Sequence, residues 1–103
     1  MNFQEALQAA KDGKKIAREG WNGKRMWVAY TPGSEIEQEN ARSGAALALS
    51  NELDKGNKIK INPHLDMKTA DGSIICGWHA TQTDMFAEDW DIVDGGICEP
   101  GEE

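Results

Sequence analysis

Aromatic and hydrogen-bonding side chains are concentrated in the run from Pro63 to Trp90. This run holds two of the four Trp residues, and it surrounds them with Thr, Ser, Gln, His and Asp side chains near a predicted turn. Flat aromatic faces beside hydroxyls, amides and backbone donors are typical of sites that hold a flat polar molecule such as a nucleotide. The pattern therefore favours the capture of a ligand as the chemistry of this chain.

The four tryptophans divide into two classes by their place in the predicted elements. Trp21 and Trp78 each stand at an element end beside Gly or Asn, where an indole can face a cleft, so ligand stacking and core packing both stay open for them. Stacking of a base on an aromatic ring contributes ~1–3 kcal/mol. Trp90 alternates with Ile92 and is expected in the core. Trp27 is expected in the core or in an oligomer interface, and it is also kept as a candidate ligand contact.

The stretch from Thr81 to Asp84 offers a row of polar groups beside Trp78. Thr81, Gln82 and Thr83 supply donors and acceptors that can line a pocket. Thr83 is predicted to cap one helical turn over Asp84 to Ala87, whose free backbone N–H groups would make a modest anion site. Asp84 either accepts hydrogen bonds from ribose hydroxyls or serves as the carboxylate at a helix start.

Catalytic and metal-binding patterns are weak throughout the chain. Four side chains could in principle form a metal or acid–base site: His64, Asp66, His79 and Asp84. Their HxD and HxxxxD spacings match no specific metal-binding pattern. Ser73 and Thr81 show no partner that would activate them as nucleophiles, and no Gly-rich phosphate loop is present. We therefore expect no catalytic residue, no metal and no cofactor.

Charge and composition limit the partners and the compartment. The net charge is −7, and eight acids with no Lys or Arg occupy the chain from Asp84 to Glu103. This argues against binding of long duplex nucleic acid, although a small anionic ligand needs only a few local cations. Neither a leader nor an apolar run of about 20 residues is visible, which predicts a soluble cytoplasmic protein away from membranes. Cys76 and Cys98 are expected as free thiols rather than a disulfide.

The hydrophobic periodicity predicts an α+β fold. Residues 1–94 are expected to form a single ligand-binding domain, and 95–103 an acidic, disordered tail. A helix should begin at Asn2 and end near Gly13, over a small antiparallel sheet, and residues 33–57 should form a variable excursion, in part helical. The strands are predicted from the following segments: 14–19, 26–30, 58–61, 67–69, 74–76 and 90–93.

Two long segments resemble a known family. The runs MNFQEALQAAKDGKKIAREGWNG and LDMKTADGSIICGWHATQTDMFAEDWDIV are similar to small phage and prophage proteins that act against the bacterial Thoeris defence, the second type described. The resemblance covers residues 1–30 and 63–94, and leaves out the central segment and the acidic tail.

The resemblance implies a sponge rather than an enzyme. Such proteins bind the cyclic ADP-ribose isomers made by Thoeris TIR proteins, and some also sequester cyclic oligonucleotide signals of CBASS at a separate site. They assemble as homotetramers with nucleotide pockets between subunits. By motif, Trp21, Asn22 and Trp78 would flank the ligand, with Thr83 and Asp84 nearby as polar contacts.

Two alternatives remain beside the sponge. One is a hydrolase that degrades the same nucleotides, using His64, Asp66 or Asp84, and the other is a direct protein inhibitor of a defence component. Arg25 stands where relatives have a small residue, so it would either contact a phosphate or be solvated. The complete set of candidate ligand contacts is Trp21, Asn22, Arg25, Trp27, Trp78, Thr81, Gln82, Thr83 and Asp84.

Overall fold

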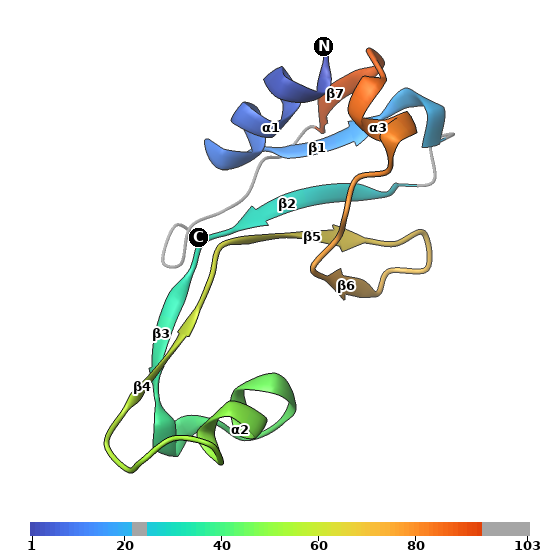
Figure 1. The fold of residues 1–103 in the computed structure, drawn as a ribbon. Coiled ribbons are helices and arrows are strands. Elements are labelled where there is room, and N and C mark those ends of the chain that lie inside the picture. Colours follow the sequence, from blue (N-terminus) through green and yellow to red (C-terminus); the bar gives the residue numbers. More distant parts are fainter. Residues whose placement is uncertain (22–24, 94–103) are drawn as a thin grey trace, which may run out of the picture. The chain divides into compact units, whose positions relative to one another are not determined.

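The computed structural model describes residues 1–21 and 25–93, which form two compact units (Figure 1). Unit 1 consists of Met1–Thr31 together with the chain from His64 onward, and unit 2 is Pro32–Pro63. The chain treated above as one domain thus has a central segment that packs on itself. Asn22 and the predicted tail 95–103, with Cys98, lie outside the described residues.

Unit 1 is a five-stranded antiparallel sheet with helices, which confirms the predicted α+β class. The strand order is β6-β5-β2-β1-β7. Its elements are α1 (Phe3–Lys11), β1 (Lys15–Arg18), the 3-10 turn η1 (Glu19–Trp21), β2 (Trp27–Thr31), β5 (His64–Lys68), β6 (Ile74–Cys76), α3 (Gln82–Phe86) and β7 (Trp90–Val93). The predicted strands are therefore confirmed to within a few residues.

The N-terminal helix follows its local sequence signals. The Asn2 side chain accepts a hydrogen bond from the Glu5 N–H, and the Glu5 carboxylate accepts one from the Asn2 N–H. This reciprocal capping box satisfies two of the orphan donors at the helix start. Gly13 has a φ of 95°, the left-handed conformation that commonly ends a helix.

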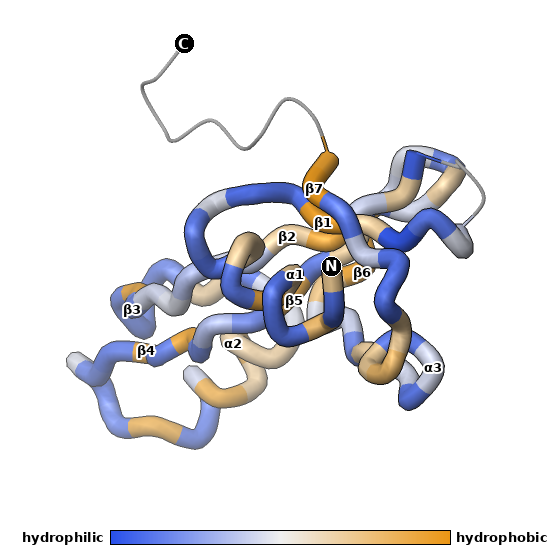
Figure 2. Tube along the Cα trace, turned by 90° about the horizontal axis from the view of Figure 1, so that it is seen from above, coloured by the Kyte–Doolittle hydropathy of each residue, from blue (hydrophilic) through white to orange (hydrophobic). Residues whose placement is uncertain are grey.

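The core of unit 1 lies between α1 and one face of the sheet. Ala6 and Ala10 of the helix pack against Ile16 and Val28, and Met67 and Trp90 complete the buried cluster. Figure 2 shows the strongly hydrophobic end of β7. Because side chains alternate across a strand, the neighbours of these buried residues point to the opposite face of the sheet. Trp90 is 2% exposed, as its alternation with Ile92 predicted.

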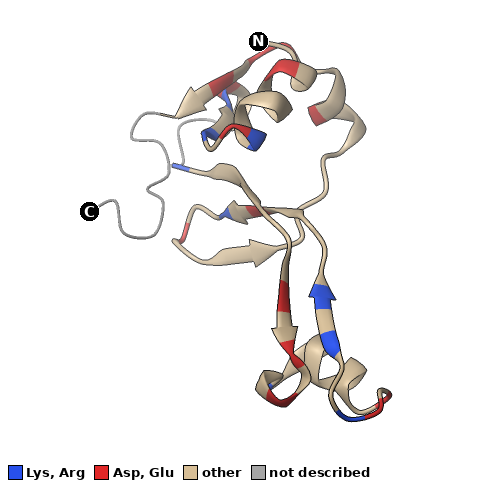
Figure 3. Ribbon diagram, turned by 90° about the vertical axis from the view of Figure 1, so that its left-hand side faces the viewer, with Lys and Arg blue, Asp and Glu red and all other residues tan. Residues whose placement is uncertain are grey.

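Unit 2 contains a strand that the sequence analysis missed. β3 (Ser34–Glu37) pairs antiparallel with β4 (Lys58–Ile61), and the 3-10 turn η2 (Gln38–Asn40) and helix α2 (Gly44–Ser50) lie between them. β3 has one apolar side chain, Ile36, so it lacks the alternation of apolar residues that predicts a strand. Opposite charges face each other instead, Glu35 with Lys60 and Glu37 with Lys58 (Figure 3).

The cap of α3 differs from the prediction. Thr81, not Thr83, is the N-cap: its hydroxyl accepts a hydrogen bond from the Asp84 N–H, and the Asp84 carboxylate accepts one from the Thr81 N–H. The Thr-x-x-Asp spacing allows this reciprocal arrangement, whereas Thr83 has no acid three residues later. Cys76 is a free, exposed thiol, and no described helix is long and apolar enough to cross a membrane.

Candidate functional site

A pocket of about 440 Å³ opens on the sheet face opposite α1. Four strands contribute to it, because alternation sends Val93, Lys15, Trp27 and Lys68 to the same side of the sheet. Lys68 lies directly opposite Trp27 in the β2–β5 ladder. The volume of the pocket is within the range of pockets that hold small molecules, roughly 300–1,000 Å³.

The lining of this pocket combines apolar and aromatic side chains with Lys and Arg side chains. The lining residues are Lys15, Ala17, Arg18, Trp21, Arg25, Met26, Trp27, Lys68 and Val93, and among the described residues no Asp or Glu joins them. The Lys15 ammonium lies 5.6 Å from the centroid of the Trp27 ring, within the range of a cation–π interaction. In a chain with a net charge of −7, this gathering of cations beside indoles favours an anionic ligand with a flat ring.

Arg18 connects the pocket to α3. Its Nε donates to Asp89 Oδ1 and its Nη1 to Asp84 Oδ1, both at 2.8 Å. The hydrogen bonds to Asp89 and then to Asp84 raise the pKa of Arg18. Burial opposes ionisation of Asp84, but the hydrogen bonds from Thr81 and Arg18 outweigh it and hold its pKa below the ordinary value. Hydrogen bonding to Arg18 likewise lowers the pKa of Asp89.

Three indoles meet behind the pocket. Trp21, Trp78 and Trp90 contact one another in edge-to-face geometry, with ring centroids 5.3–6.4 Å apart. The Trp90 Nε1 donates to the Asp84 carbonyl at 2.9 Å, and Phe3 packs on the other side of Trp90. Such contacts stabilise the rings beyond their area burial. Trp21 and Trp78 are thus half-buried parts of an aromatic cluster that extends the core.

The predicted site residues fall into two groups in the structure. Trp21, Arg25 and Trp27 line the pocket. The others lie at the start of α3 or beside it: Trp78, Thr81, Gln82, Thr83 and Asp84. Trp78 joins the first group through Trp21, and Asp84 joins it through Arg18. Both Asp84 oxygens accept hydrogen bonds from within the protein, and Gln82 and Thr83 are exposed on the first turn of α3.

Asp66, one of the residues considered for catalysis, takes part in other interactions. Asp66 accepts hydrogen bonds from the Thr31 hydroxyl and, at 3.0 Å, from the Gly77 N–H, and its carboxylate lies 3.4 Å from His64 Nε2. Within residues 1–21 and 25–93, no three His, Cys, Asp or Glu side chains are grouped to hold a metal ion.

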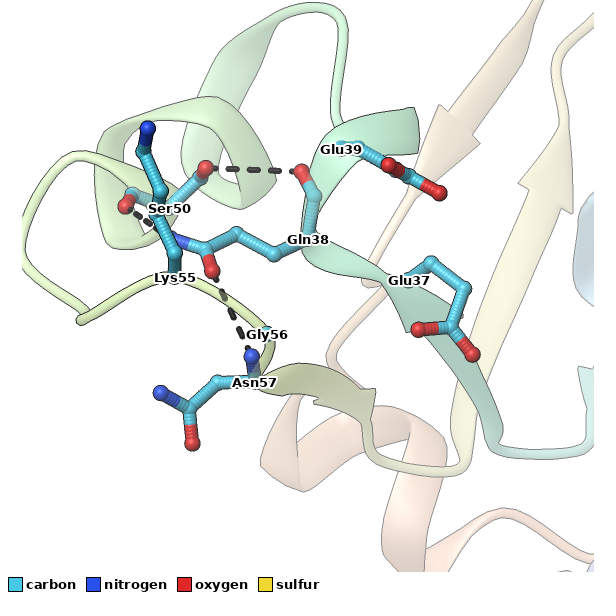
Figure 4. Close-up of a pocket in the computed structure, with 7 residues that line it drawn as sticks. All are labelled: Glu37, Gln38, Glu39, Ser50, Lys55, Gly56 and Asn57. Carbon is cyan, nitrogen blue, oxygen red and sulfur yellow. Dashed lines mark hydrogen bonds between the residues drawn. The ribbon is translucent and has the colours of Figure 1, made fainter.

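Two further hollows are present, each within one unit. In unit 2 a hollow of about 520 Å³ is lined by Glu37, Gln38, Glu39, Ser50, Lys55, Gly56 and Asn57. Figure 4 shows how the Gln38 side chain occupies its centre and hydrogen-bonds the Ser50 carbonyl and the Asn57 N–H. The other, in unit 1, is edged by carboxylates, Glu19, Glu88, Asp89 and Asp91 among them. Acidic residues line both hollows, whereas the pocket beside Trp27 has no Asp or Glu among its described lining residues.

Comparison with known proteins places the chain. The family profile of the Thoeris anti-defense 2-like domain matches residues 1–93. The chain belongs to this family. It is 41% identical over 93 residues to Thoeris anti-defense 2 of Bacillus phage SP01, an alignment that covers 90% of this chain and 94% of that protein. The family resemblance inferred from the two sequence segments is thereby confirmed.

The sequence analysis did not predict Lys15 and Lys68 as lining residues of the pocket beside Trp27. Both lie on strands, and the sequence around each predicts an ordinary solvent-exposed lysine. Lys15 alternates with the buried Ile16, so Lys15 is expected on the face opposite the core. The neighbouring sequence does not predict that Trp27 lies beside Lys15. Only the pairing of β5 with β2 brings Lys68 next to the same indole.

Proposed function

We propose that this protein binds and sequesters cyclic ADP-ribose isomers made by Thoeris TIR proteins in the host cytosol, and so blocks the defence. The observation that carries the proposal is the pocket beside Trp27, whose charged lining residues are all cations. Family membership supports the Thoeris context. As part of the same proposal, cyclic oligonucleotide signals of CBASS are captured at a separate site.

Each lining residue has a defined role in this proposal. Trp27 and Trp21 provide aromatic walls for a base, and stacking of this kind contributes ~1–3 kcal/mol per base. Lys15 and Arg25 offset the charge of the phosphates. Arg18 already neutralises two carboxylates, so we assign it to the support of the pocket wall.

Capture without chemical change is the proposed mode of action. The carboxylates that a hydrolase would use as a base are occupied: Asp84 by Arg18 and Thr81, and Asp66 by Thr31 and Gly77. Rigid aromatic walls and preformed cation positions reduce the cost of ordering on binding and favour tight, reversible capture. The protein acts stoichiometrically in this proposal and needs no metal or cofactor.

A release assay tests the proposal. Protein is incubated with cyclic ADP-ribose isomers, separated from free nucleotide, heat-denatured, and the supernatant is analysed by mass spectrometry. Intact isomer in the supernatant supports sequestration, and a cleaved product would favour the hydrolase. No captured nucleotide, together with a stable complex with a TIR protein or its effector, would favour the direct inhibitor.

Matched lysine variants locate the ligand. Lys15→Gln should weaken binding of the captured isomer by about tenfold, the worth of one charge-assisted contact. Lys60→Gln removes the same charge from β4 of unit 2 and should leave the affinity unchanged. Equal affinities of the two variants, measured by isothermal titration calorimetry, would exclude the pocket beside Trp27 as the site.

We also propose that the protein works as a homotetramer. Several large apolar side chains of unit 1 are exposed, namely Ile74, Ile75, Met85 and Phe86, the last at 79%. Burial of such side chains in an interface would be favourable. Native mass spectrometry measures the mass of the assembly directly, and a monomer at micromolar concentration would contradict this part of the proposal.

A further inference from the structure

Arg25 has an unusual backbone at the edge of the pocket. Its φ is 58°, and it is the single non-glycine residue with a positive φ among the described residues. The left-handed conformation brings Cβ close to the following carbonyl and is unfavourable for a side chain such as Arg. Strained positions of this kind are retained where neighbouring contacts hold them, often at sites that clamp a ligand.

Lys68 supplies such a contact. Its Nζ donates a hydrogen bond to the Arg25 carbonyl oxygen at 2.9 Å. Lys68 is the last residue of β5 and is paired on one side with Trp27 of β2 and on the other with Ile74 of β6. A charged donor fixed on a rigid strand therefore holds the backbone of Arg25, and Arg25 lines the same pocket.

We propose that Lys68 is a positioning residue that holds Arg25 in the conformation in which its guanidinium receives the anionic part of the ligand. The inference rests on the proposed function and assigns different roles to two cations of one pocket. Arg25 makes the direct contact, because a planar guanidinium can donate two parallel hydrogen bonds to a phosphate. Lys68 acts through Arg25, since one of its donors is committed to the Arg25 carbonyl.

A double-mutant cycle separates positioning from direct contact. The variants are Lys68→Met, Arg25→Gly and the double substitution, each titrated with the cyclic ADP-ribose isomer that the unaltered protein captures. Arg25→Gly should weaken binding by about tenfold or more. Lys68→Met should weaken it severalfold when Arg25 is present, and by less than about twofold in the Arg25→Gly background, because residues that act through one another are not additive.

Equal losses from Lys68→Met in both backgrounds would overturn the inference, since they would show that Lys68 contacts the ligand independently of Arg25. Lys68→Arg keeps a charged donor and should recover most of the affinity. A Lys68→Arg variant as weak as Lys68→Met would also count against a positioning role.

A second measurement needs no ligand. Trypsin cleaves after Arg25 only when that backbone can leave its held conformation. Lys68→Met should therefore increase the rate of cleavage of the Arg25–Met26 bond severalfold, measured by mass spectrometry, while the matched variant Lys60→Met in unit 2 should not. If the unaltered protein captures no isomer, the proposed function fails, yet unchanged cleavage in Lys68→Met would still refute the hold on Arg25.

Discussion

The substitution Asp84→Asn tests whether Asp84 stabilises the fold or contacts the ligand. The Asp84 side chain is 10% exposed, against 29% for Asp89, and is the more buried of the two carboxylates paired with Arg18. One oxygen accepts from Arg18 Nη1 at 2.8 Å and the other from the Thr81 N–H at 3.0 Å. The amide keeps a single acceptor oxygen, so the variant loses one of these bonds and the charge that pairs with Arg18.

The expected cost follows from these contacts. A hydrogen bond to a charged group contributes about 1.5–3 kcal/mol, and a carboxylate in the first turn of a helix adds about 0.3–1 kcal/mol. Because Asn still satisfies one partner, we expect a loss of about 2 kcal/mol in the free energy of unfolding. For a domain of this size each kcal/mol lowers Tm by roughly 4–8 °C, so the melting temperature should fall by about 8–16 °C.

The assay combines thermal denaturation with ligand titration well below Tm. Asp84→Asn should retain the affinity for the captured nucleotide to within about threefold, which is about 0.6 kcal/mol, because both Asp84 oxygens face protein donors. Glu88→Gln is the matched control, since it removes one negative charge from an exposed position in the same segment. It should leave Tm within a few degrees of the unaltered protein.

Two results would refute this reasoning. A Tm equal to that of Glu88→Gln would show that the Arg18–Asp84 pair contributes little to stability. A loss of affinity beyond about tenfold in fully folded Asp84→Asn would return Asp84 to the ligand contacts.

Three further predictions concern stability. Trp90→Phe leaves a cavity and removes the hydrogen bond from Trp90 Nε1 to the Asp84 carbonyl, and it should lower the free energy of unfolding by about 2–3 kcal/mol in urea denaturation. Gly33→Ala would place a Cβ 2.6 Å from the Ile61 carbonyl oxygen, so hydrogen exchange should accelerate in β3 and β4 but not in unit 1. The pKa values of Asp84 and Asp89 are lowered in the folded protein, so both carboxylates stabilise the fold fully above pH 3.8, their ordinary pKa. This stabilisation is lost as the pH falls below 3.8. Circular dichroism should therefore show unfolding in that acid range, with a shallower pH dependence in Asp84→Asn.

Local signals predicted the elements whose information lies within a few residues. The capping box of Asn2 and Glu5 and the glycine after α1 fixed that helix, and the alternation of β7 placed Trp90 in the core. β3 escaped prediction because it is defined by its pairing with β4, including Ile36 opposite the buried Ile59, a contact that its own four residues do not encode.

The site was predicted only in part for the same reason. The sequence identified Trp21, Arg25 and Trp27, since aromatic and charged residues near a turn are visible locally. It left two roles open for Asp84, a ligand contact or the carboxylate at a helix start, because a linear pattern does not reveal a partner elsewhere in the fold; the role as a ligand contact stays a prediction. Arg18, 66 residues away, is that partner.

The sequence by itself thus determined the family, the α+β class and several of the residue types that line the candidate pocket. The tertiary structure decided which of those residues share a pocket, because the order of strands in the sheet sets the neighbours of each side chain. Pairing of β2 with β5 brings Lys68 to Trp27 and to the Arg25 carbonyl, and pairing of β1 with β7 brings Arg18 to Asp89. The run from Pro63 to Trp90 therefore supplies Lys68 to the pocket and, through Trp78 and Asp84, the support behind it.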